Sequence, residues 1–235
     1  MCTQGVAAQQ TAPARPVNRG PTLQAVLFDM DGTLVDTEPY WIAAEHRLVE
    51  SFGGTWSDEQ AHSLVGNALL ASGAYLRDHG PVPLTAEQIV DELLDDVVAA
   101  THREVPWRTG ALDLLADLAE ARVPCAMVTM SYSRLATIVA EALPPGSLAA
   151  VVTGDQVEDG KPHPEAYLTA AARLGVDPAA CVAIEDSPTG VASARAAGCV
   201  VVAIPHHVPV DPAPGLHVAG SLAELKADSL AGLLR

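Results

Sequence analysis

Short apolar runs that end in polar or turn-forming residues recur along most of the chain. They cover residues 25–28, 125–129, 149–153, 181–185 and 199–204. The runs are rich in valine and do not alternate with polar residues, which is typical of strands buried on both faces of a sheet. This pattern predicts five strands of a parallel sheet.

Stretches with helical spacing separate most of these runs. Residues 110–121 place Leu112, Leu115 and Leu118 on one side of a helix, and Gly198 follows another helical stretch as a typical C-cap. We predict helices over 110–121, 135–143, 164–174 and 189–197. The alternation of strands and helices predicts an α/β fold with a Rossmann-like parallel sheet core.

The segment 38–107 has a different pattern, with no strand signal. Ser57 with Gln60, and Thr85 with Gln88, form capping-box patterns that open helices. We therefore predict an inserted α-helical cap domain over residues 38–107, and a core built from 23–37 and 108–235. Residues 1–22 lack the basic start and apolar block of a secretory signal. They are expected to be a flexible leader outside the fold.

Composition and charge narrow the function classes. Hydrophobic residues make up 49% of the 235 residues, enough for a sizeable core. A net charge of −16 argues against binding nucleic acids or anionic membranes, which needs clustered Lys and Arg. No apolar run is long enough to cross a membrane. The four cysteines form no CxxC pair, so we expect buried thiols and a reducing, cytoplasmic compartment.

Pairs of carboxylates follow two of the predicted strands. Asp29 and Asp31 end the first run, and Glu185 and Asp186 end the fourth. Ligands of open α/β sheets bind beyond the carboxyl ends of the strands. If these two strands are close, the four acids converge and need a cation, and oxygen ligands suit Mg²⁺. The alternative is two solvated polar turns.

Hydroxyl and ammonium groups occupy comparable positions in two other segments. Thr129 ends the second run and leads into Ser131, while Lys161 precedes a predicted helix. The chain has only two lysines, so a lysine here is informative as a compact positive charge. Taken singly, Thr129 is better explained as a cap of the next helix, and Lys161 as a solvated loop cation.

Four features follow one another along the chain. They are Asp29-x-Asp31-Gly32-Thr33, a strand-end hydroxyl, a lysine before a helix and a strand-end Glu-Asp pair. The combination resembles the haloacid dehalogenase superfamily over nearly the whole chain after the leader. The helical insertion is similar to that of the branch with β-phosphoglucomutase and phosphoglycolate phosphatase. Met130 departs from the family pattern, which commonly has a small or polar residue there.

This resemblance implies a mechanism. Asp29 would be the nucleophile that forms an aspartyl-phosphate, and Asp31 the general acid and base. Thr129, Ser131 and Lys161 would hold the phosphoryl oxygens. The Mg²⁺ ligands would be Asp29, the Asp31 carbonyl and Asp186, with Glu185 binding directly or through water.

Several branches of the superfamily differ at residues visible in this chain. Asp31 favours phosphoryl transfer over dehalogenation, and a cap without lysine disfavours phosphonate hydrolysis through a Schiff base. Leu69 stands where β-phosphoglucomutase carries a phosphate-binding Arg, although cap arginines 47, 77 or 103 could replace it. We therefore expect a Mg²⁺-dependent phosphatase for a small phosphomonoester of sugar, polyol or glycolate type. The alternatives are a phosphomutase and an inactive phosphate- or partner-binding module.

Residues around the insertion allow further expectations. The segments 36–38 and 107–110 are expected to form the two hinges of the cap. Tyr40 and Trp41 could line the substrate pocket, but packing under the cap is the preferred interpretation. His206 and His207 are expected to lie in a loop and to point apart, as neighbours do in an extended chain, which disfavours joint metal ligation.

Overall fold

A six-stranded, fully parallel sheet forms the centre of the molecule in a computed structural model that describes residues 22–65 and 67–234. The predicted leader lies almost entirely outside these residues. The strand order is β3-β2-β1-β4-β5-β6. The strands are β1 (Ala25–Phe28), β2 (Cys125–Val128), β3 (Ala150–Val152), β4 (Cys181–Glu185), β5 (Val200–Ala203) and β6 (Leu216–Val218).

The α/β class and the five predicted strands are confirmed, but the sixth strand was not predicted. β6 is three residues long, and His217 and Val218 are exposed at the edge of the sheet. An edge strand with one neighbour needs no continuous apolar run, so the pattern that marks the inner strands is missing there.

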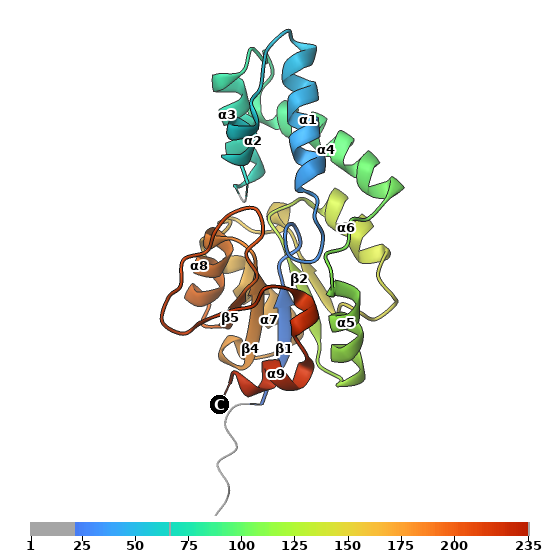
Figure 1. The fold of residues 1–235 in the computed structure, drawn as a ribbon, viewed down its shortest axis with the longest axis vertical. Helices are drawn as coiled ribbons and strands as arrows, with labels where there is room; N and C mark the ends of the chain where they lie inside the picture. The colour runs from blue at the N-terminus through green and yellow to red at the C-terminus, as the bar shows by residue number, and fades with distance from the viewer. Residues whose placement is uncertain (1–21, 66, 235) are drawn as a thin grey trace, which may run out of the picture.

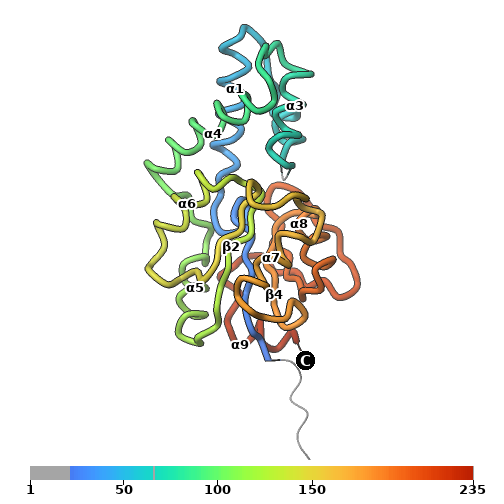
Figure 2. The backbone as a smooth tube through the Cα atoms, turned by 180° about the vertical axis from the view of Figure 1, so that it is seen from behind, coloured from blue at the N-terminus to red at the C-terminus, as the bar shows by residue number. Residues whose placement is uncertain are grey.

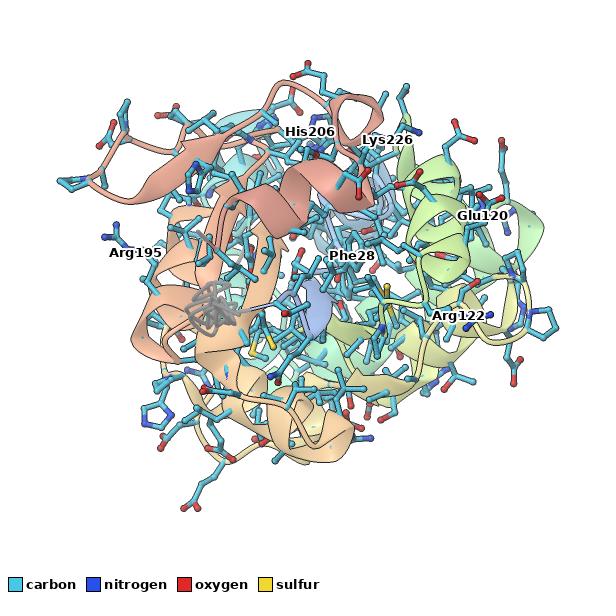
Figure 3. All side chains as sticks on the ribbon, turned by 90° about the horizontal axis from the view of Figure 1, so that it is seen from below. Phe28, Glu120, Arg122, Arg195, His206 and Lys226 are labelled. Carbon is cyan, nitrogen blue, oxygen red and sulfur yellow. The ribbon has the colours of Figure 1, made fainter. Side chains whose placement is uncertain are left out.

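Helices cover both faces of the sheet. α7 (Glu165–Leu174) and α8 (Pro188–Ala196) share one hydrophobic cluster with Ala25 and Leu27 of β1. α5 (Ala111–Glu120), α6 (Ser133–Glu141) and α9 (Ala227–Gly232) share the other with Val26 and Phe28. Alternate residues of β1 therefore serve opposite layers, and Figure 3 shows Phe28 in the middle of the molecule.

Four helices lie beyond the carboxyl end of the sheet, as Figures 1 and 2 show. They are α1 (Glu38–Ser51), α2 (Asp58–His62), α3 (Leu69–His79) and α4 (Ala86–Arg103). Both predicted capping boxes are present, at Ser57 before α2 and at Thr85 before α4. No strand interrupts the described part of segment 38–107, and its status as a separate domain stays a prediction.

The two connections between these helices and the sheet run side by side. The Asp36 N–H donates to the Pro106 carbonyl at 2.8 Å, and the Arg108 N–H donates to the Leu34 carbonyl at 2.9 Å. The Arg108 guanidinium also donates to the carbonyl of Gly32. Each predicted hinge thus has a residue bonded to the opposite connection, just beyond the other hinge. The position and motion of the hinges stay predictions.

The expectation of buried cysteine thiols is confirmed for the cysteines that the structure describes. Cys125, Cys181 and Cys199 are free and buried, and Cys2 lies outside the described residues. Among helices of the described segments, none combines the length and the apolar character that a membrane span requires.

Candidate active site

The adjacency of β1 and β4 brings the two predicted pairs of acids to one edge of the sheet. Phe28 pairs with Ile184 in register, so the residues that follow both strands leave the sheet together. Carboxylate oxygens of Asp29, Glu185 and Asp186 lie within 4.8 Å of one another, and all three residues are buried. The alternative of two solvated turns is therefore wrong for these three residues.

Lys161 binds two of these acids from the loop before α7. Its Nζ donates to Asp29 Oδ1 and to Glu185 Oε1, both at 2.6 Å, and to the carbonyl of Val128 at 2.9 Å. The side chain of Lys161 is 5% exposed, so this is a buried ion pair rather than a solvated loop cation. The hydroxyl of Tyr167 in α7 donates to the same Glu185 oxygen at 2.6 Å and fixes its orientation.

Asp31 faces a different set of partners, all of them hydroxyls. Thr37 Oγ1 donates to Asp31 Oδ1 at 2.5 Å. Thr129 Oγ1 and Ser131 Oγ donate to Oδ2 at 3.1 and 2.8 Å. Both oxygens of the Asp31 carboxylate thus have hydroxyl partners, and metal binding by the Asp31 backbone carbonyl stays a prediction. Thr129 and Ser131 lie beside Asp31, and their predicted role in phosphate binding stays a prediction.

The electrostatics of the acid trio call for a further positive charge. Burial raises the pKa of Asp29 well above its usual value, and although Lys161 opposes this, Glu185 and Asp186 raise it further. Burial and the charge of Glu185 likewise raise the pKa of Asp186. Lys161 supplies one positive charge to three carboxylates. Three close, hard oxygen donors fit Mg²⁺, which would restore the charge balance.

Two glycines make room for this arrangement. A Cβ on Gly32 would lie 2.0 Å from Asp186 Oδ2, and Gly32 has a φ of +81°. A Cβ on Gly190, in the first turn of α8, would lie 1.9 Å from Glu185 Oε2. Glycine is therefore required at both positions for the carboxylates to approach the backbone this closely.

A pocket opens between the carboxyl edge of the sheet and the helices α1, α3 and α4. The space between its walls is about 830 Å³ when the open mouth is included. The sheet side contributes Asp29, Asp31, Gly32, Thr129, Met130, Ser131, Lys161, Asp186, Ser187 and His207. The helical side contributes Glu38, Trp41, Glu45, Leu64, Val65, Asn67, Leu69, Ser72 and Leu93.

The helical side of the pocket holds residues that the sequence reasoning missed. Glu38 was predicted only as a hinge residue, and Glu45 was not singled out. With Trp41 they occupy positions i, i+3 and i+7 of α1, a signal for one helix face. Trp41 does both things considered for it, because it lines the pocket and is only 8% exposed. Tyr40 lies outside the pocket lining and donates to the Glu104 carbonyl.

Leu69, at the place of the mutase arginine, lines the pocket, whereas Arg47, Arg77 and Arg103 do not. Arg47 pairs instead with Asp96, and Arg77 with Asp78. Gly66 of the same loop lies outside the described residues.

Met130, the departure from the family pattern, contacts the lysine loop. Its Sδ accepts a hydrogen bond from the Lys161 backbone N–H at 3.1 Å, and its side chain lines the pocket. A Cβ on Gly160 would lie 2.9 Å from the same sulfur atom. Met130 therefore supports the position of Lys161 rather than displacing it.

The two histidines after β5 were expected to point apart, and this was wrong. His206 Nε2 and His207 Nε2 contact the two carboxylate oxygens of Asp36 at 3.1 and 2.9 Å, and their rings lie 4.0 Å apart. The turn after Pro205 rotates the two side chains to the same side, which an extended chain would not do. Both contacts lower the pKa of Asp36 against the effect of burial, so a negative charge is held at the first hinge.

Fold and pocket together define a Rossmann-like α/β protein with an acidic pocket at the carboxyl edge of its sheet, beneath a helical insertion. The family model for haloacid dehalogenase-like hydrolases matches residues 23–198. The chain belongs to this family, as its sequence motifs predicted.

Similar proteins include named phosphatases. The chain is 35% identical over 190 residues to validoxylamine A 7'-phosphate phosphatase of Streptomyces hygroscopicus subsp. limoneus, covering 77% of this chain and 85% of that protein. It is 33% identical over 190 residues to hexitol phosphatase A of Escherichia coli (76% and 81%). CbbY of Rhodobacter sphaeroides, solved with xylulose-(1,5)bisphosphate, superposes with a TM-score of 0.78 at 27% identity (86% and 96%).

Proposed function

We propose that this hydrolase is a Mg²⁺-dependent phosphatase that acts on a phosphomonoester of a small sugar or polyol. The observation that carries the proposal is the meeting of three buried carboxylates with one buried lysine at the carboxyl edge of the sheet. The names of two relatives, a validoxylamine phosphate phosphatase and a hexitol phosphatase, support the substrate class.

The reaction divides into two displacements. In the first, an Asp29 oxygen attacks phosphorus, the bond from phosphorus to the leaving oxygen breaks, and Asp31 gives that oxygen a proton. In the second, water attacks phosphorus, gives a proton to Asp31 and breaks the bond to Asp29, which releases inorganic phosphate. The Thr37 hydroxyl at 2.5 Å holds Asp31 in place for both proton transfers.

The phosphoryl oxygens need donors and positive charge around them. Thr129, Ser131 and Lys161 supply these from the sheet side. Asp29, the Asp31 carbonyl and Asp186 would hold Mg²⁺, with Glu185 as a direct or water-mediated ligand. When bound, Mg²⁺ offsets the negative charge of the acids and of the phosphate dianion.

The two alternatives receive less support. A phosphomutase must bind a second phosphate, and no arginine lines the pocket among the described residues. An inactive binding module would be expected to lose one of the two reacting aspartates, yet Asp29 and Asp31 both line the pocket. Hydrolysis is therefore the activity that the geometry supports best.

The test is hydrolysis of an aryl phosphate with Mg²⁺, compared with the Asp29→Asn variant and with added chelator. Activity that is lost in both cases supports the proposal, and radiolabelled phosphate trapped on the wild type but absent from the variant identifies the nucleophile. A variant with wild-type turnover would overturn the role of Asp29. Unchanged activity in chelator would overturn the need for a metal.

A further inference from the structure

One face of α1 presents two glutamates and a tryptophan to the pocket. Trp41 lies about one helical turn after Glu38, and Glu45 lies about two turns after Glu38. All three residues line the pocket. They belong to the helical side, whereas Asp29 and Lys161 belong to the sheet side. A substrate with its phosphate at Asp29 would therefore direct its leaving group toward this face.

Glu45 is buried and Glu38 is half-buried, and neither glutamate pairs with a cation in the described part of the chain. None of the ion pairs within residues 22–65 and 67–234 involves Glu38 or Glu45. Glu45 is 4% exposed, and its Oε2 accepts a hydrogen bond from Trp56 Nε1 at 3.1 Å. Burial raises the pKa of Glu38 to about 8 and that of Glu45 to about 7, and the charge of Glu45 adds to the shift of Glu38.

Positive charge is scarce around the space that a leaving group would occupy. Among the described residues of the pocket lining, Lys161 is the only lysine or arginine, and Asp29 and Glu185 hold it. His207 also lines the pocket, but its Nε2 contacts Asp36. A second anionic group on the substrate would therefore meet two acids and no free cation.

We propose that Glu38, Trp41 and Glu45 form a leaving-group subsite that accepts hydroxyl or ammonium groups and rejects a second phosphate or a carboxylate. The inference rests on the proposed phosphatase activity and narrows its substrates to monophosphates with a neutral or cationic carbon skeleton. A carboxyl group can donate or accept hydrogen bonds with hydroxyls, and a carboxylate pairs with an ammonium. The Trp41 indole offers an apolar face to the C–H groups of a polyol.

The experiment measures binding rather than turnover. The Asp29→Asn variant of the full chain, with Mg²⁺ at pH 8, is titrated calorimetrically with glucosamine 6-phosphate, glucose 6-phosphate and 6-phosphogluconate. These monophosphates carry an ammonium, only hydroxyls, or a carboxylate on the leaving group. We expect affinity to fall in that order, by about tenfold or more from first to last, as expected for charges several ångströms apart in a partly buried site.

Added substitutions assign the effect to residues. Glu38→Gln and Glu45→Gln, each in the Asp29→Asn background, should reduce the ratio between the first and last compound by several-fold. Glu50→Gln, on an exposed position of the same helix outside the pocket lining, should leave the ratio unchanged.

The proposed subsite would be overturned by equal affinities for the three compounds or by the reverse order of affinity. It would also be overturned if none of the three compounds binds. The order in the Asp29→Asn protein tests the inference even if a glutamate variant fails to fold. Failure of the phosphatase proposal is separate, because it appears as absent aryl phosphate turnover in the wild type.

Discussion

Gly32 is the position where a single methyl group should disable the proposed metal site. Its φ of +81° lies in the left-handed region, and a Cβ there would lie 2.0 Å from Asp186 Oδ2. Real Cβ atoms essentially never approach another atom within 3.0 Å, so the Asp186 carboxylate or the Gly32 loop must move by about 1 Å. Gly32→Ala therefore separates Asp186 from Asp29 and Glu185.

The size of the effect has two parts. The left-handed backbone costs a non-glycine residue about 1–2 kcal/mol, which lowers the melting temperature of a chain of this size by roughly 2–8 °C. A displacement of about 1 Å at a reacting centre costs on the order of 100-fold in rate. We expect both in Gly32→Ala, measured by calorimetric melting and by kcat/KM for an aryl phosphate across a Mg²⁺ titration.

Gly53→Ala provides the matched control. Gly53 has a φ of +78°, but a Cβ there would meet nothing within 4 Å. This variant should show the same loss of melting temperature and keep wild-type activity. If Gly32→Ala stays within about threefold of Gly53→Ala in kcat/KM, Asp186 does not depend on the absence of a Cβ at Gly32.

Three further variants test the buried charges. Lys161→Met leaves the Asp29 and Glu185 carboxylates without their shared cation, so the free energy of unfolding in urea without Mg²⁺ should fall by about 3–5 kcal/mol; an unchanged urea midpoint would contradict this. Burial raises the pKa of Glu45 from 4.5 to about 7, so the unfolded chain ionises first and stability should fall as pH rises through this window. Glu45→Gln should lack that part of the fall in a series of urea midpoints, and an identical slope would count against it. Tyr167→Phe removes the donor to Glu185 and should cost about 1–3 kcal/mol in the same urea assay, so a loss below that range would refute the role of the hydroxyl.

Sequence patterns predicted the centre of the fold because burial on both faces leaves a readable signal. β1 and β4 are continuous apolar runs, and their carboxyl ends had to meet once the strands were parallel neighbours. The placement of Asp29, Glu185 and Asp186 follows from this one geometric rule. Lys161 could be named as a candidate, but its two carboxylate partners depend on the path of a loop.

The features that escaped prediction depend on how distant segments turn toward one another. Glu38 and Glu45 share a helix face, yet only the position of α1 above the sheet makes that face part of the pocket. His206 and His207 both contact Asp36, and His207 lies 171 residues from it in the sequence. No local periodicity reports such a contact.

The charges of the two sides of the pocket suggest a division of roles. On the sheet side, carboxylates outnumber the single lysine, so a phosphate dianion can enter favourably only together with a cation. On the helical side, the subsite proposed at Glu38 and Glu45 would disfavour further anions and favour hydroxyls or amines. Under the two proposals, binding of the phosphate and selection of the leaving group rest on separate residues. A substitution on α1 can therefore change the preferred substrate while Asp29 and Asp31 keep the same chemistry.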